Sequence, residues 1–130
     1  MKYIDLHTHT NFSDGVVSLE HSLNEAEAVG LSLFSVSDHN TVAAYSALDE
    51  SRHLFSGAIL PAVELSTTFR GDVIEILGYG IDVHKMNTLI SEYYYSFYDK
   101  QVKEARLDAD AMLSAGVTLD DEFVRAMTEE

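Results

Sequence analysis

The sequence contains no cysteine, which excludes disulfide bonds and thiolate metal ligands. Any metal ion must therefore be held by nitrogen and oxygen atoms. The sequence also lacks a run of the roughly 18 apolar residues that a membrane-spanning helix needs. Asp5 and His7 interrupt any apolar run near the N-terminus, which is not typical of a signal peptide. We therefore expect a soluble cytoplasmic protein that has no membrane partner.

Basic residues are scarce, with 8 Lys and Arg against 22 Asp and Glu and a formal net charge of −14. A chain with this balance repels nucleic acids and anionic membranes at long range, which disfavours long nucleic acid as a partner. Bound divalent cations can reverse the sign of the charge locally. A small phosphorylated substrate held at metal ions is therefore compatible with the acidic composition.

Internal repeats and linkers rich in Pro, Gly or Ser are absent, and 130 residues with 46% hydrophobic composition suit one small domain. Short runs of apolar residues predict strands. Apolar residues at helical spacing, bounded by capping residues such as Ser18 and Gly30, predict helices. The predicted strands are residues 3–6, 31–37, 58–66 and 72–79, and the predicted helices are residues 19–29, 42–55 and 87–115. Residues 117–130 are predicted to form a short turn followed by part of another helix. Because strands alternate with helices, we expect an α/β fold with a largely parallel sheet.

Two histidines, His7 and His9, follow the first predicted strand. Residues i and i+2 of an extended segment lie on the same face, so the two imidazoles can bind one cation together. Taken alone the pattern is weak, because two surface histidines would look the same. Its position strengthens it, since ligands of open α/β sheets and barrels bind at the carboxyl edge of the strands.

Further histidine and carboxylate side chains follow in order along the chain. Asp14 lies in the same loop, His39 follows the second predicted strand and Glu64 lies at the end of the third. Successive strand ends therefore deliver potential ligands to one edge, which predicts a site for zinc, manganese or iron. A carboxylate such as Glu64 can bridge two ions, and paired ions can cleave phosphate esters through a metal-bound hydroxide.

Asp38, which precedes His39, has two interpretations. Its carboxylate could accept a hydrogen bond from an imidazole and fix the tautomer of that ring. It could instead cap the helix that begins near Val42. Asp38 and His39 are also the two candidates for proton transfer during hydrolysis, and we therefore list both as candidate catalytic residues.

Short segments of the sequence resemble the PHP (polymerase and histidinol phosphatase) family of metal-dependent phosphoesterases. They are DLHTHT (5–10), SDG (13–15), SDHN (37–40), VELS (63–66) and LGYG (77–80). The resemblance is close up to about residue 82 and looser beyond it. It implies a distorted (β/α)7 TIM-like barrel with up to three metal ions at its C-terminal rim. It further implies that His7, His9 and Glu64 hold the first ion, that Glu64 bridges to a second, and that Asp14 and His39 hold a third.

The chain departs from the family pattern in two respects. Glu75 stands where the family usually carries a histidine ligand, so Glu75 is either a substitute ligand or a solvated strand residue beside a degraded site. The family's later histidine and Asp-x-His ligands have no counterpart here. We therefore expect an apparently truncated barrel, with residues 1–86 as its N-terminal part and residues 87–130 as a helical insertion. A homo-oligomer could complete such a barrel.

The resemblance implies hydrolysis of a phosphate ester, with a small phosphate monoester, a nucleotide or a short oligonucleotide as substrate. The alternative is a non-catalytic or degraded PHP module with a structural or interaction role. An amidohydrolase is a third possibility, which the motif series fits poorly. We interpret the aromatic run at residues 93–98 as packing or an interface rather than chemistry.

Overall fold

The computed structural model describes residues 3–93 and 97–120. The chain divides into two compact units, Met1–Tyr94 and Tyr95–Glu130. All strands within the described ranges belong to the first unit, and helix α4 (Phe97–Ser114) belongs to the second. The candidate ligands found among the described residues all belong to the first unit.

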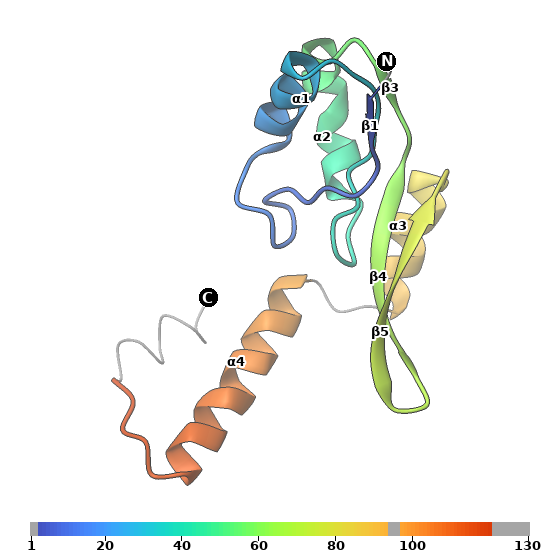
Figure 1. The fold of residues 1–130 in the computed structure, drawn as a ribbon. Helices are drawn as coiled ribbons and strands as arrows, with labels where there is room; N and C mark the ends of the chain where they lie inside the picture. Colours follow the sequence, from blue (N-terminus) through green and yellow to red (C-terminus); the bar gives the residue numbers. More distant parts are fainter. Residues whose placement is uncertain (1–2, 94–96, 121–130) are drawn as a thin grey trace. The chain divides into compact units, whose positions relative to one another are not determined.

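A small parallel sheet forms the frame of the first unit (Figure 1). Its strands, in spatial order, are β1 (Tyr3–Asp5), β2 (Leu31–Phe34) and β3 (Ala58–Ile59). Backbone hydrogen bonds continue this pairing past the strand ends. The Ser37 N–H donates to the Thr8 carbonyl over 2.8 Å, and the Asn40 N–H donates to the Glu64 carbonyl over 2.8 Å. The loops that follow β1 and β2 are therefore held side by side.

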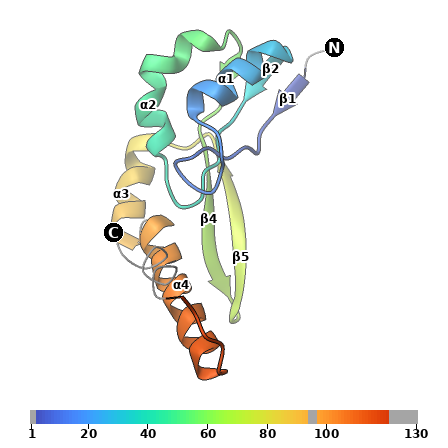
Figure 2. The same cartoon turned by 90° about the vertical axis from the view of Figure 1, so that its left-hand side faces the viewer.

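Helices α1 (Leu19–Ala28) and α2 (Ala43–Ser51) lie together beside the parallel sheet, followed by the short 3-10 helix η1 (Arg52–Leu54) (Figures 1 and 2). Helix α1 begins where predicted, because the Ser18 hydroxyl accepts a hydrogen bond from the His21 N–H, and it ends before Gly30, whose φ is +72°. The apolar core that joins these helices to the sheet contains Leu19, Leu23, Ala26, Phe34, Val36, Ala44 and Phe55. Each large side chain buried there contributes about 1.5–3 kcal/mol.

An antiparallel hairpin continues from this sheet. It consists of β4 (Ala62–Phe69) and β5 (Asp72–Tyr79), with helix α3 (Val83–Tyr93) packed against it (Figure 2). The two turn residues, Arg70 and Gly71, both have positive φ, as a type I′ hairpin turn requires. Val63 and Ile90 form a second buried cluster with Val42 between the hairpin and α3.

The α/β class is confirmed, but three details of the prediction are wrong. The strand predicted at 58–66 is interrupted at Leu60 and Pro61, because proline has no N–H to donate to a ladder. The fourth strand pairs antiparallel with its predecessor, so the pairing is mixed. Helix α3 begins at Val83 rather than Asn87, because the Asp82 carboxylate accepts a hydrogen bond from the Lys85 N–H and caps the first turn.

Two predictions fall on parts that the structure does not describe. Residues 94–96 and the aromatic side chains of the run at 93–98 lie outside the described set, as does the start of a further helix expected within 117–130. Within residues 3–93 and 97–120, no helix has both the length and the apolar composition to cross a membrane.

Candidate metal centre

Imidazole and carboxylate groups from several segments of the first unit converge where the parallel pairing ends. The loop after β1 supplies His7, His9 and Asp14, the loop after β2 supplies His39, and the hairpin supplies Glu64 and Glu75. Within the described residues they form three candidate ligand groups, which are His7–His9–Glu64, His9–Asp14–His39 and His39–Glu64–Glu75. In each group the ligand atoms lie within 4.8 Å of one another. The structure thus brings together all the residues that the sequence proposed as ligands.

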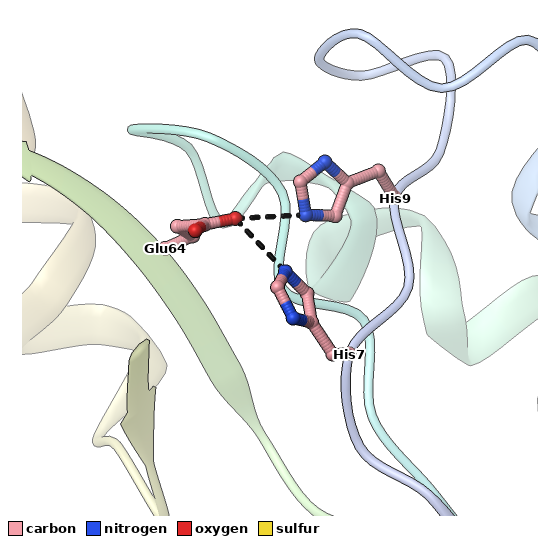
Figure 3. A group of neighbouring side chains, drawn as sticks. All are labelled: His7, His9 and Glu64. Carbon is pink, nitrogen blue, oxygen red and sulfur yellow. Dashed lines mark hydrogen bonds and ion pairs between the residues drawn. The ribbon is translucent and has the colours of Figure 1, made fainter. Parts of the chain in front are cut away.

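Glu64 lies at the centre of the first group (Figure 3). Its Oε2 atom is 3.1 Å from His7 Nε2 and 2.9 Å from His9 Nε2. Neighbouring ligands of an ion with bonds of about 2.0–2.2 Å lie roughly 3.0–3.5 Å apart, so these separations suit a shared cation. The Glu64 side chain is 8% exposed, whereas that of His7 is 51% exposed, so one side of the group is open to solvent.

The His9 ring shows why a cation fits this group. Its Nε2 atom is buried and has no hydrogen-bond partner, because the contact with Glu64 lacks hydrogen-bond geometry. A buried polar atom without a partner is costly. On the other side of the ring, Nδ1–H donates to the Asp14 carboxylate over 2.6 Å, so the free lone pair of the ring is on Nε2. A carboxylate that orients a histidine in this way is typical of metal sites.

His39 extends the site toward Asp14. Its Nε2 atom is 3.6 Å from Asp14 Oδ2 and 3.6 Å from Glu64 Oε2, and its ring meets the His9 ring edge-on at a centroid distance of 4.6 Å. Burial raises the pKa of Asp14, but the hydrogen bond from His9 and the electrostatic attraction of the His9 and His39 rings outweigh it and leave the pKa below its ordinary value. The Asp14 carboxylate is therefore ionised at neutral pH, as a metal ligand must be.

Glu75 lies on the far side of His39. Its Oε1 atom is 3.5 Å from His39 Nδ1, and its side chain is 47% exposed. Because an imidazole usually binds an ion through one nitrogen, His39 can join Asp14 and Glu64 through Nε2 or join Glu75 through Nδ1. In the first arrangement Glu75 orients the ring, and in the second it is itself a ligand.

The position of Glu64 differs from the prediction. It does not end a strand but lies inside β4, which continues to Phe69 as an arm of the hairpin. Glu64 forms an isolated parallel bridge with His39, in the loop after β2. The parallel pairing ends at this bridge, whereas β4 itself continues. From this position in β4 Glu64 nevertheless faces His7 and His9 (Figure 3).

The surroundings of Asp38 correct both structural interpretations offered for it. Helix α2 has Val42 as its N-cap residue and no side-chain capping bond. The buried Asp38 carboxylate accepts hydrogen bonds from the Thr10 N–H (2.6 Å), the Thr10 hydroxyl (2.7 Å) and the Ser13 hydroxyl (2.7 Å) rather than from an imidazole. Sequence reasoning missed the supporting roles of Thr10 and Ser13, although both adjoin predicted ligands.

Comparison with known proteins supplies relatives along most of the chain. No family model matches the sequence. The 5′-3′ exoribonuclease Rnm of Escherichia coli (strain K12) is 30% identical over 115 residues, which are 87% of this chain and 39% of that protein. Rnm of Salmonella typhimurium is 36% identical over 81 residues, 61% of this chain and 28% of that protein. The chain therefore spans less than half the length of these curated relatives.

Two solved structures share the fold. An amidohydrolase from Chromobacterium violaceum, with bound sulfate and no metal, matches 89% of this chain and 40% of its own with a TM-score of 0.73 and 22% identity. A proposed metal-dependent phosphoesterase from Bifidobacterium adolescentis matches 99% of this chain and 44% of its own with a TM-score of 0.65 and 21% identity. At these identities the matches define the fold and not the reaction.

The chain has the fold of these two proteins, and its cluster of histidine and carboxylate side chains is of a kind that could hold metal ions. Its motifs and its similarity to the exoribonucleases support a PHP-type family, over part of the length of those relatives. The family resemblance inferred from the sequence is thereby confirmed.

Proposed function

We propose that the protein hydrolyses phosphate esters at a divalent metal centre. The proposed ligands are His7, His9, Asp14, His39, Glu64 and Glu75. The observation that carries this proposal is the buried His9 Nε2 atom, which faces the Glu64 carboxylate without a hydrogen bond. The relatives that are named as exoribonucleases support a phosphoester as the bond that is cleaved.

Mixed imidazole and carboxylate ligands favour zinc, manganese or iron, with up to three ions in a complete family site. Ions held there would supply a water of lowered pKa and positive charge for the phosphoryl oxygens. The carboxylates of Asp14, Glu64 and Glu75 would by themselves repel an anionic phosphate. The same carboxylates suit phosphate binding once divalent cations neutralise them.

The proposed substrate is a nucleotide, a short oligonucleotide or another small phosphate monoester. The exoribonuclease names of the relatives favour the nucleotide classes. The net charge of −14 still disfavours an extended nucleic-acid interface, so we propose recognition of a terminal phosphate rather than of a long strand.

His39 is better placed than Asp38 to move a proton. The Asp38 carboxylate accepts three hydrogen bonds in a buried position, and protonation would break this arrangement. His39 Nε2 instead faces the Asp14 and Glu64 carboxylates. We propose that His39 is a ligand or the proton carrier, and that Asp38 supports the site without exchanging protons.

We also propose that the first unit is part of a distorted (β/α)7 barrel, with a helical insertion over residues 87–130. Exposed apolar side chains on β1 and β5 support this proposal, since further strands would cover them. Tyr3 is 57% exposed, Ile4 59%, Val73 70% and Ile76 51%. Alternatively, a second copy of the chain in a homo-oligomer would cover these side chains.

The proposed location of the protein is the cytoplasm.

The alternative function is a metal-binding module without catalysis. The half-exposed Glu75 in place of a family histidine favours it, since such a change could mark a degraded second site. This alternative predicts bound metal without turnover.

Hydrolysis assays with manganese- or zinc-loaded protein distinguish these functions. We expect turnover of nucleoside monophosphates or short 5′-phosphorylated RNA, and a loss of at least roughly 100-fold in His7→Ala, because this change removes a ligand. His7 is half-exposed, so the variant should fold. His53→Ala, an exposed histidine in η1, is the matched control. Metal binding without turnover would support the non-catalytic module. If the protein neither binds metal nor turns over a phosphoester, both the phosphoesterase and the metal-binding module are refuted.

A further inference from the structure

We propose that Asp38-His39-Asn40 acts as a clamp that positions the ligand-bearing segments before any ion binds. Asp38 holds the loop that carries His9 and Asp14, and Asn40 holds the hairpin that carries Glu64 and Glu75. The inference deepens the proposed function and rests on it for the identity of the ligands. Asp38 and Asn40 are positioning residues, because neither belongs to the candidate ligand groups.

The hydrogen bonds of Asp38 reach the neighbours of two ligands. Thr10, which follows His9, donates its N–H and its hydroxyl to Asp38, and Ser13, which precedes Asp14, donates its hydroxyl. Asp38 is 1% exposed and Thr10 is 0% exposed. Charge-assisted hydrogen bonds of this kind are stronger than neutral ones, and a buried carboxylate without them would be strongly destabilising. The bonds therefore fix both ends of the short loop between the two ligands.

The loop itself is compact around Thr10. The Thr10 carbonyl accepts hydrogen bonds from the N–H groups of Ser13 and Gly15, each over 3.0 Å. The Ser13 hydroxyl also lies 3.3 Å from Asp14 Oδ1. Movement of Thr10 would therefore displace Asp14 as well as His9, so one buried carboxylate controls the position of both.

Asn40 makes the corresponding connection to the hairpin. Its φ of 51° lies in the left-handed region, which asparagine tolerates better than most residues. Its Oδ1 accepts from the Ser66 N–H over 2.9 Å and its Nδ2 donates to the Ser66 hydroxyl over 3.1 Å. The side chain thus continues the pairing with β4 after the backbone of this loop turns away.

Ser66 links Asn40 to both hairpin carboxylates. It lies two residues after Glu64 in β4 and stands opposite Glu75 in the antiparallel ladder. The backbone of Asn40 adds a hydrogen bond to the Glu64 carbonyl. A fully hydrogen-bonded buried network rigidifies its surroundings, and a site that is already ordered binds its ligand at lower entropic cost.

If this clamp exists, the hydrogen bonds of Asp38 to the loop and those of Asn40 to the hairpin can be removed separately by substitution. Asp38→Asn retains the size of the side chain but replaces an acceptor oxygen with a donor. Asn40→Gly removes both side-chain bonds without placing a Cβ at a positive φ. We expect Asp38→Asn to affect the loop at residues 10–15, and Asn40→Gly to affect the hairpin around Ser66. Asp49→Asn, at an exposed site on α2, makes the same chemical change as Asp38→Asn and is the control.

The test combines amide hydrogen exchange in metal-free protein with Mn²⁺ binding by calorimetry. We expect Asp38→Asn to accelerate exchange at residues 10–15 at least about tenfold with the hairpin unchanged, and Asn40→Gly to give the opposite pattern. Both should weaken Mn²⁺ binding at least about tenfold although every ligand is present. Asp49→Asn should match the unmodified protein.

Unchanged exchange in Asp38→Asn, or equal acceleration throughout the first unit in both variants, would overturn the clamp. If Asp38→Asn does not fold, Thr10→Val replaces it, because this change removes one hydroxyl and little volume. Local acceleration at residues 10–15 in Thr10→Val would support the clamp, and acceleration throughout the unit would overturn it. If the unmodified protein binds no Mn²⁺, the proposed function fails, while the exchange pattern still decides the clamp.

Discussion

Glu75 is the residue at which one substitution should change the metal chemistry most clearly. Its carboxylate faces His39 Nδ1 at 3.5 Å from a half-exposed position. We expect Glu75→His to raise the affinity for zinc relative to manganese, because imidazole is a softer ligand than carboxylate. We expect Glu75→Gln to weaken binding of one ion at least about tenfold and to spare the group around His7.

Metal analysis and calorimetry with zinc and manganese test this prediction. Asp72→Asn, at the exposed start of β5, is a control of similar charge change outside the candidate groups. If Glu75→Gln binds both metals with the same stoichiometry and affinity as the unmodified protein, Glu75 is neither a ligand nor an orienting group.

The candidate ligands could be proposed from the sequence residue by residue, whereas the hydrogen-bond partners of Asp38 could not. His7 and His9 share a face of an extended segment, and this local pattern is visible in the sequence. The partners of Asp38 lie 28 and 25 residues away along the chain, and nothing in the local sequence indicates them. The choice among capping, imidazole and loop interactions for Asp38 therefore required the tertiary structure.

Among the elements, the loop after β1 depends on Gly15. A Cβ at this position would lie 2.4 Å from the His9 carbonyl oxygen and 2.7 Å from the Thr10 nitrogen, both backbone atoms that cannot move aside independently. We expect Gly15→Ala to displace the loop, weaken metal binding and lower the melting temperature. Gly78→Ala in β5 is the control, since its nearest contacts are at an ordinary 3.6 Å. Equal melting temperatures and metal affinities for the two variants would contradict this account.

Tyr45 connects α2 to two strand segments. Its hydroxyl donates to the Val36 carbonyl over 2.6 Å and accepts from the Ala62 N–H over 2.8 Å. Burial raises the pKa of Tyr45 to about 12, against the lowering effect of the backbone hydrogen bonds. We expect Tyr45→Phe to lower the free energy of unfolding by about 1–3 kcal/mol at neutral pH, because it leaves buried backbone groups without partners.

The raised pKa also predicts a pH dependence. Above the unfolded pKa of about 10 the unfolded chain loses the Tyr45 proton while the folded protein retains it, so stability falls as pH rises from there toward the folded value. Urea unfolding at pH 8 and at pH 10.5 should show a steeper fall for the unmodified protein than for Tyr45→Phe. Tyr79→Phe, at an exposed position, should behave like the unmodified protein. If the free energy of unfolding of all three proteins falls equally between pH 8 and pH 10.5, the raised pKa of Tyr45 is contradicted.

The positions of the elements were more predictable than their pairing. Helix α1 could be predicted from Ser18 and Gly30 because capping is a local interaction. The antiparallel pairing of β4 with β5 depends on the turn at Arg70 and Gly71, a two-residue connection that is too short for a parallel crossover. This turn is the signal in the sequence that indicates antiparallel pairing.

For the whole molecule, the division into two units predicts where metal binding is located. All candidate ligand groups of the described residues lie in the unit Met1–Tyr94. We expect a protein shortened after Tyr94 to bind Mn²⁺ with the same stoichiometry and affinity as the complete chain, because every ligand and both buried clusters remain. Calorimetry on both forms measures this. A loss of binding in the shortened form would show that residues 95–130 contribute to the site.

The α/β class could be recognised at this scale from the alternation of elements, but membership of a closed barrel could not be derived. Closure depends on strands that would cover β1 and β5, and the chain spans less than half the length of its curated relatives. The exposed apolar side chains on those two strands support the proposal of a barrel without showing it.

The most direct test of the central claim is anomalous diffraction from crystals of the protein soaked in manganese or zinc. The account predicts a peak about 2.0–2.2 Å from both His9 Nε2 and Glu64 Oε2, with His7 completing the group. Crystals that show no peak at this position, with the three side chains placed as in Figure 3, would contradict it.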